Sequence, residues 1–203
     1  MRCSTVAMSA TQVTVPTPGR YVVSLSGRFS SGWAGGFTQA VSRLGFNIES
    51  GFAARNQRGH WTAEFDLSAT PIAADPFTVD FQALVEAPPV AGPLPPLRLH
   101  RYSLLRAAGE SRVALTIDAP DQVGFLAALL TPLSMFSLFP VEMRIDTVRA
   151  VVHDRFYLRS TAGRAPSDEA LLSVRQWLDR CVPMGASSLP GLAVRSSWER
   201  TAG

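Results

Sequence analysis

The order of strand-like and helix-like segments in the first half of the chain recurs in the second half, and this repeat restricts the fold more than any other feature. Alternating apolar residues indicate strands, whereas apolar residues three or four apart indicate helices. The first half has predicted strands at 20–27, 46–55, 60–68 and 97–105 and helices at 34–44 and 75–86. The second half has predicted strands at 112–118, 141–148, 152–159 and 192–198 and helices at 124–139 and 167–181. Each half therefore has the predicted order β-α-β-β-α-β.

This order is that of the split βαβ, or ferredoxin-like, motif. We therefore predict an α+β protein with two ferredoxin-like βαββαβ modules, each with an antiparallel four-stranded sheet. The modules are expected at residues 20–106 and 111–200, after a flexible tail at residues 1–19 that is rich in Ser, Thr and Pro. The two sheets could lie side by side as one eight-stranded surface, and their open edges invite pairing with a second chain.

Composition argues against several classes of protein. The 203 residues are 46% hydrophobic and 17% charged, which is enough apolar material for a core and unlike a disordered chain. The net charge is +3, and all the basic residues are arginines spread from Arg2 to Arg200, without the cluster that a nucleic-acid surface needs. Cys3 and Cys181 form neither a metal motif nor a disulfide framework. We expect a cytoplasmic protein without a cofactor or a nucleic-acid partner.

The most apolar stretch, residues 124–141, raises the question of a membrane segment. Thr131, Pro132, Ser134 and Ser137 interrupt it, and it is shorter than a bilayer requires. We therefore predict a helix buried on several sides and no membrane partner. The first residues also lack the continuous apolar segment of a secretory signal.

Short motifs in the second half resemble the ACT domain family. They are IDAP at 117–120, GFLA at 124–127, DRFYL at 154–158 and SDE at 167–169. Together they are similar to the ACT domains at the C terminus of bacterial protein-PII uridylyltransferases, in which Asp-x-Pro-Gly-Leu-Leu joins the first strand to the first helix and Asp-x-Phe-Tyr-Leu follows. In the first half, LGFNIES at 44–50 resembles the helix-to-strand turn of the same family. The resemblance implies a tandem ACT protein.

ACT domains commonly bind a small effector, often an amino acid, at the loop before the first helix. A helix start offers backbone N–H groups to a carboxylate, and a nearby Asp can hold an ammonium group. The resemblance therefore implies that the ligand-binding residues of the second half are Asp118, Asp121, Gly124 and Phe125. The loop here is longer than the family pattern, and Asp121 could instead only cap the helix.

The corresponding loop of the first half lacks an Asp and is rich in Ser and Gly. Its candidate ligand-binding residues are Ser31, Gly32 and Gly35, and the alternative is a flexible turn that precedes the helix. These departures leave two possibilities open, a loop that binds a ligand and a loop that only supports pairing between domains.

The predicted function is regulation without catalysis. We expect a sensor that binds a small metabolite, an amino acid by resemblance, or a protein partner, and that forms homodimers or larger homo-oligomers. The alternatives are a ligand-free dimerisation or interaction module and a small enzyme on the same fold. His60, His100 and His153 show no metal-ligand spacing, and no Gly-x-Ser-x-Gly motif is present, so no catalytic or metal-binding residue is assigned.

Overall fold

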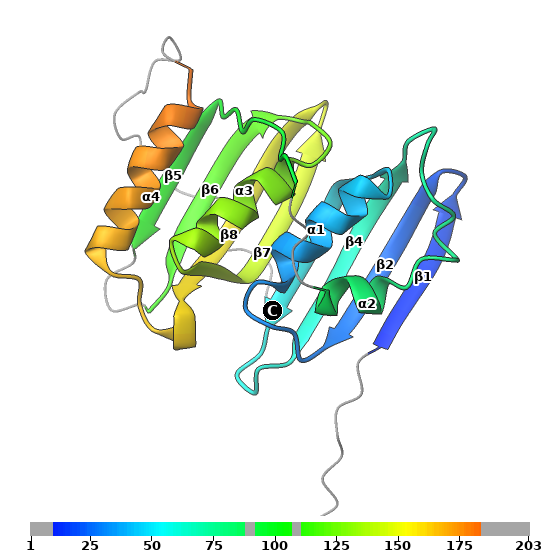
Figure 1. Cartoon of the computed structure of the whole chain (residues 1–203), viewed down its shortest axis with the longest axis horizontal. Coiled ribbons are helices and arrows are strands. Elements are labelled where there is room, and N and C mark those ends of the chain that lie inside the picture. The colour runs from blue at the N-terminus through cyan, green and yellow to red at the C-terminus, as the bar shows by residue number, and fades with distance from the viewer. Residues whose placement is uncertain (1–9, 88–91, 107–110, 184–203) are drawn as a thin grey trace, which may run out of the picture.

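The computed structural model describes residues 10–87, 92–106 and 111–183. Figure 1 shows strands in one sheet with helices packed across it. In chain order the elements are β1 (Ala10–Thr17), β2 (Arg20–Gly27), α1 (Trp33–Arg43), β3 (Phe46–Arg55), β4 (Trp61–Ala69), α2 (Phe81–Glu86), β5 (Arg101–Arg106), β6 (Val113–Pro120), α3 (Phe125–Met135), β7 (Leu138–Val148), β8 (Val151–Ser160), the short η1 (Thr161–Gly163) and α4 (Asp168–Cys181).

The eight strands form a single antiparallel sheet in the order β1-β2-β4-β3-β7-β8-β6-β5. Strands of the first half occupy one side of the sheet and strands of the second half the other. The two sides meet where β3 pairs with β7, from Ser50 opposite Asp146 to Ala54 opposite Glu142. The α+β class, the antiparallel pairing and the repeated order of elements are confirmed, but the halves share one merged sheet instead of having a sheet each.

The repeated unit is ββαββα, which differs from the predicted βαββαβ. The predicted strand at residues 97–105 corresponds to β5, and β5 pairs with β6, with Leu104 opposite Leu115. It therefore begins the second half instead of ending the first. The predicted boundary at residues 107–110 lies outside the described residues, between β5 and β6 in the chain. Short connections favour hairpins between consecutive strands, and this local preference decides the partner of β5.

The tail predicted at residues 1–19 contains a strand, so this prediction was wrong for residues 10–17. β1 pairs with β2 in a hairpin, with Val13 opposite Val23. Gly19 closes the turn with a φ of +78°, a conformation that glycine adopts without strain. The strand predicted at residues 192–198 lies outside the described residues.

Two helices are shorter than predicted. α2 begins at Phe81 and not at residue 75, because the Asp80 side chain accepts a hydrogen bond from the Ala83 N–H (3.0 Å) and caps the helix there. Phe77 has the spacing of an apolar residue on the buried face of the predicted helix, but its side chain is 68% exposed. α3 ends before Ser137, whose φ of 57° leaves the helical region and leads directly into β7.

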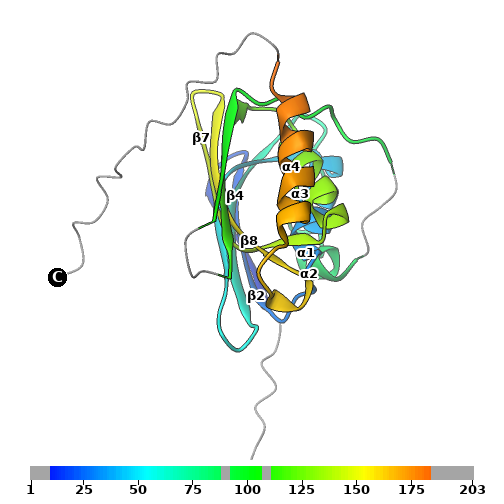
Figure 2. The ribbon, with the colours of Figure 1, turned by 90° about the vertical axis from the view of Figure 1, so that its left-hand side faces the viewer.

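All four helices cover the same face of the sheet (Figure 2). Between helices and sheet, the first half has an aromatic core that includes Trp33, Phe37, Trp61 and Phe65. The core of the second half is largely aliphatic. α3 lies between α1 and α4 in Figure 1 and is buried along most of its length, as the sequence predicted. In the described part of the chain, no helix is long and apolar enough to cross a membrane.

Replacing Phe156 with alanine tests the core under α3. Phe156 is 0% exposed, so Phe156→Ala should lower the free energy of unfolding by roughly 3–5 kcal/mol through lost burial and the cavity left behind. Phe77→Ala removes the same side chain from an exposed position and should change stability little. Urea unfolding measures both. Equal losses of unfolding free energy in the two variants would contradict a buried Phe156 and an exposed Phe77.

Candidate functional site

The loop at residues 121–124 places the start of α3 beside the boundary between the two halves. The Asp121 N–H donates to the Ala150 carbonyl (3.0 Å), and the Phe125 N–H donates to the Gln122 carbonyl (3.0 Å). Gly124 precedes the helix with a φ of +82°. None of the described side chains caps α3, so the Leu126 and Ala127 N–H groups of its first turn, unlike that of Phe125, remain available to a ligand.

A small pocket lies at this helix start, with walls from both halves of the chain. Thr38 and Ser42 of α1 and Asn47 of β3 come from the first half, and the 121–124 loop, Thr147 and Asp154 come from the second. The pairing of β3 with β7 stops at Ser50 and Asp146, so Asn47 and Thr147 lie beyond the last paired residues. The cavity measures about 20 Å³, which is enough for one water molecule.

Asp154 is the most unusual residue of the pocket. It lies on β8 facing the helices and is 0% exposed. Its Oδ1 accepts a hydrogen bond from the Asp146 N–H (3.2 Å), but its Oδ2 has no partner among the described residues. Burial raises the pKa of Asp154 to about 8, and the Asp146 and Asp121 charges act in the same direction against the backbone hydrogen bond. Buried carboxyl groups normally have partners, so Asp154 makes this pocket the candidate functional site.

Asp121 is the second carboxyl group of the pocket, and it is tied to the first half of the chain. Asn47 Nδ2 donates to Asp121 Oδ2 (3.3 Å) and lies 3.4 Å from Glu49 Oε1. Ser68 Oγ also donates to Glu49 Oε1 (2.5 Å). Burial, followed by the Glu49 charge, raises the pKa of Asp121. A group that changes the position of Asp121 would therefore act on β3 as well.

The pocket suits an ammonium group better than a metal ion. In the regions that the structure describes, no three His, Cys, Asp or Glu residues lie close enough to hold a metal. A primary ammonium is about the size of the single water that the cavity admits, and two carboxyl groups can accept its hydrogen bonds. The α3 start can at the same time receive a carboxylate, so the combination matches a zwitterion.

The structure brings together three of the four residues predicted for the second half. Asp121, Gly124 and Phe125 all line the pocket. Asp118 does not, because side chains alternate along β6 and Asp118 points to the face without helices. There it is paired with Arg101, and its Oδ1 lies 2.7 Å from His153 Nδ1. Burial raises the pKa of Asp118, but the hydrogen bonds to these two residues outweigh it, and the pKa falls below its ordinary value.

The residues predicted for the first half lie at the other end of the crevice between α1 and α3. Ser31, Gly32 and Gly35 line a separate hollow of about 200 Å³ with Thr131 and Ser134 of α3. Gly35 is inside α1, where a Cβ would lie in ordinary van der Waals contact, 3.7 Å from the Thr131 N, so this position packs against α3. This hollow contains no acidic residue.

Sequence reasoning missed Asp154 and Asn47 as site residues. One signal could have identified Asp154: it occupies a helix-facing position in β8, where its neighbours on that face are Val152, Phe156 and Leu158. A carboxyl group in such an apolar series has to be buried. Asn47 gave no comparable signal, because its partner Asp121 is distant in the sequence.

No protein-family model matches the chain, and the searches of curated proteins and of solved structures found no match either.

Replacing Gly124 with alanine tests the geometry of the helix start. A Cβ at Gly124 would lie 3.1 Å from Ser42 Oγ, and the φ of +82° disfavours any L side chain. Gly124→Ala should therefore lower the free energy of unfolding by about 1–2 kcal/mol. Gly32→Ala is the matched control, since Gly32 also precedes a helix but has a φ of −93°, and its Cβ would lie in ordinary van der Waals contact, 3.9 Å from Phe139 Cε1. Thermal unfolding compares the two variants. If Gly32→Ala lost as much stability as Gly124→Ala, the result would contradict a special backbone conformation at Gly124.

The pKa of Asp154 predicts how stability depends on pH. Between the ordinary value of 3.8 and about 8, the folded protein retains a proton that the unfolded chain releases. The contribution of Asp154 to stability is therefore full below pH 4 and declines as the pH rises to 8, by at most ~6 kcal/mol. Asp154→Asn should remove this decline, as measured by urea unfolding between pH 4 and 8.

Asp118→Asn provides a control of opposite sign. The lowered pKa of Asp118 gives stability that is present above pH 4 and is lost as the pH falls through the folded-state value. Asp118→Asn should therefore weaken the protein at neutral pH and leave the decline toward pH 8 in place. If the stability of Asp154→Asn declined between pH 4 and 8 as steeply as that of the original chain, Asp154 would not be the cause of the decline.

Proposed function

We propose that this chain is a non-catalytic binding protein that senses a small ligand with a primary ammonium group, of the amino-acid type, at the pocket beside the start of α3. The observation that carries the proposal is Asp154, a fully buried carboxyl group with one oxygen that no described residue contacts. Such a group costs stability unless a ligand satisfies it. Selection for binding explains its presence better than selection for packing does.

The chemistry of recognition follows from the groups around the pocket. The ligand ammonium enters the water-sized cavity between Asp121 and Asp154 and replaces missing hydrogen bonds. The ligand carboxylate lies at the first turn of α3, where free N–H groups and the helix dipole favour negative charge. Asp154 has to lose its proton to hold the ammonium, so binding releases a proton near neutral pH.

The resemblance to tandem ACT domains supports the same kind of ligand. Those domains commonly bind amino acids at the loop between the first strand and the first helix, and in the second half this loop contains Asp121 and Gly124. The fold departs from the expected module in that the strand completing each half-sheet precedes the split βαβ unit instead of following it. β2, β4 and β3, with α1, have the split βαβ order, and so do β6, β8 and β7 with α3.

Sensing requires two states with different affinities for the ligand. In the state seen here the cavity admits only one water-sized group, so a larger ligand fits better when the walls separate. Those walls are α1 and β3 on one side and α3 on the other, and the Asn47–Asp121 contact bridges them. Ligand binding would thus bias the packing of the two halves, and a second copy or a protein partner reads the change.

A second candidate function, a ligand-free interaction module, is favoured by the sheet face that the described helices leave open (Figure 2). On this face Phe52 is partly exposed beside Arg144, whose guanidinium carbon lies 5.5 Å from the ring centroid. β1 and β5 each pair on one side only within the described chain. Both features suit strand or surface pairing with another protein.

Thermal unfolding with added ligands separates the two candidates. At pH 8, millimolar free amino acids and ethylammonium should raise the melting temperature, since a ligand of the folded state stabilises it by mass action, whereas acetate should not. The increase should be smaller at pH 6, where Asp154 retains its proton. Asp154→Asn and Asp121→Asn should abolish the effect.

Asp118→Asn is the matched control, because it removes a carboxylate from the opposite face of the sheet. It should retain the ligand effect. If no amine changes the melting temperature, or if the shift survives in Asp154→Asn, the sensor proposal fails and the interaction module remains.

A further inference from the structure

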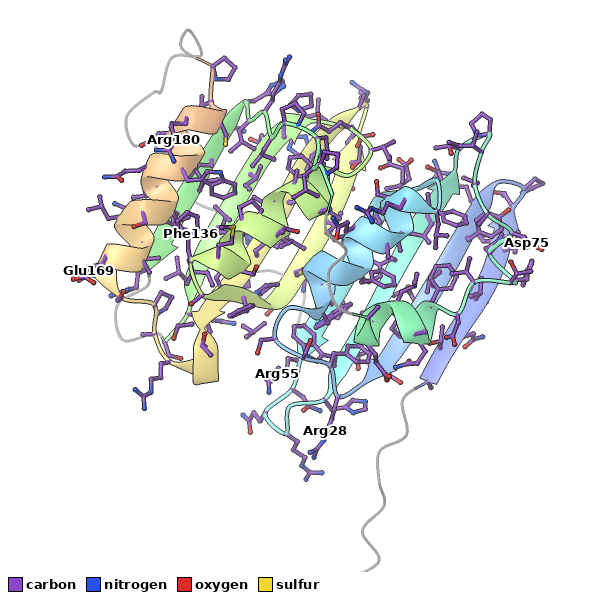
Figure 3. All side chains as sticks on the ribbon, viewed as in Figure 1. Arg28, Arg55, Asp75, Phe136, Glu169 and Arg180 are labelled. Atoms are coloured by element: carbon purple, nitrogen blue, oxygen red, sulfur yellow. The ribbon has the colours of Figure 1, made fainter. Side chains whose placement is uncertain are left out.

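A basic groove lies at the opposite end of the molecule from the Asp154 pocket, where α1 begins. It consists of two adjoining hollows of about 240 and 330 Å³ that share Arg55, Val141, Arg159 and Gly163. Figure 3 shows Arg55 at this end, near Arg28 and the β3–β4 hairpin. The two hollows together are large enough for a small organic molecule.

Two arginines of the basic groove have no acidic partner. Arg55 and Arg159 line both hollows, and neither forms an ion pair with any described residue. Arg159 Nε is buried and has no hydrogen-bond acceptor within the described chain. The acidic residue of the groove, Glu142, is already engaged by Arg112 (3.7 Å) and Arg144 (3.7 Å). The groove therefore has excess positive charge.

Buried indole N–H groups add to the donors at this end. Trp61 lines the smaller hollow and is 1% exposed, and its Nε1 has no acceptor among the described residues. Trp33, the first residue of α1, packs against Trp61 with ring centroids 5.3 Å apart and has the same unsatisfied Nε1. Buried N–H groups are rarely left without an acceptor, so the Trp61 indole indicates a missing acceptor at the smaller hollow, whereas Trp33 packs behind Trp61 and lines neither hollow.

The start of α1 also favours a negatively charged ligand in the basic groove. Ser31 lines the smaller hollow just before the helix. The first turn contains no acidic residue, and no described side chain caps it. The Trp33 and Gly35 N–H groups already donate to the Ser30 and Gly32 carbonyls (3.3 and 3.2 Å). The contribution of the helix start is therefore mainly its partial positive charge, which favours an anion.

We propose that the basic groove binds an oxyanion, specifically the phosphate group of a small organic ligand, between Arg55, Arg159 and the start of α1. Guanidinium groups hold phosphate oxygens through paired, charge-assisted hydrogen bonds, and a phosphate has enough oxygens to engage both arginines together with an indole N–H. The basic groove and the Asp154 pocket have opposite charge and share no lining residue. This proposal therefore does not depend on the proposed function.

Isothermal titration calorimetry with inorganic phosphate and pyrophosphate tests the proposal on the full chain. Arg159→Gln and Arg55→Gln should each weaken binding about tenfold, because each removes a charged donor pair. Arg180→Gln removes the same charge from α4, distant from the basic groove in Figure 3, and should leave binding unchanged. Asp154→Asn should also leave it unchanged, which separates the two sites. Circular dichroism confirms that each variant is folded.

Citrate and acetate at equal ionic strength identify the class of oxyanion. Phosphate or pyrophosphate binding that exceeds carboxylate binding supports the phosphate assignment. Stronger carboxylate binding that still depends on Arg55 and Arg159 would overturn the phosphate assignment and retain an oxyanion site. Two results would overturn the site itself: no heat above that of sodium chloride, or equal losses in Arg159→Gln and Arg180→Gln.

Discussion

The pairing of β3 with β7 is the interaction on which the rest of the molecule depends. Five consecutive residues of each strand, from Ser50 opposite Asp146 to Ala54 opposite Glu142, join the two half-sheets. This joint brings α1 against α3, where a Cβ at Gly35 would be in van der Waals contact with α3, 3.7 Å from the Thr131 N. Beyond these five residues, the two strands are no longer paired at either end of the joint. The Asp154 pocket lies at one end of the joint, and the basic groove lies at the other.

The sequence predicted most of the secondary structure but not all of the pairing. Alternation of apolar residues shows which face of a strand is buried, and it located β2, β3, β4, β6 and β8 well. It does not show which strand is the neighbour, so β5 was assigned to the wrong half. β1 was not predicted, because Val13 and Val15 lie among Ser, Thr and Pro residues that suggested a loop. The turn at Pro18 and Gly19 was the missed signal.

The candidate site was predictable where it is local in the chain. A loop before a helix keeps its residues together, so Asp121, Gly124 and Phe125 lie at one place. Asp118 comes just before that loop, but the two-residue period of β6 turns it to the other face. Asn47 and Asp154 reach the pocket from β3 and β8 through tertiary packing, which short motifs do not encode. Arg55 and Arg159, the unpaired arginines of the basic groove, likewise come together only in the folded chain.

The two halves place different residues at equivalent positions in the sheet. Ala63 is opposite Leu25 in the first half and Asp154 is opposite Ile117 in the second, and each precedes a buried Phe two residues later. An alanine there buries no polar group, whereas a buried carboxyl group without a full set of partners lowers stability. Mutation and drift remove such costly residues unless selection maintains them. If the proposed ligand maintains Asp154, position 154 is an evolutionary marker: in lineages without that ligand, it should change to a small apolar residue before the surrounding core changes.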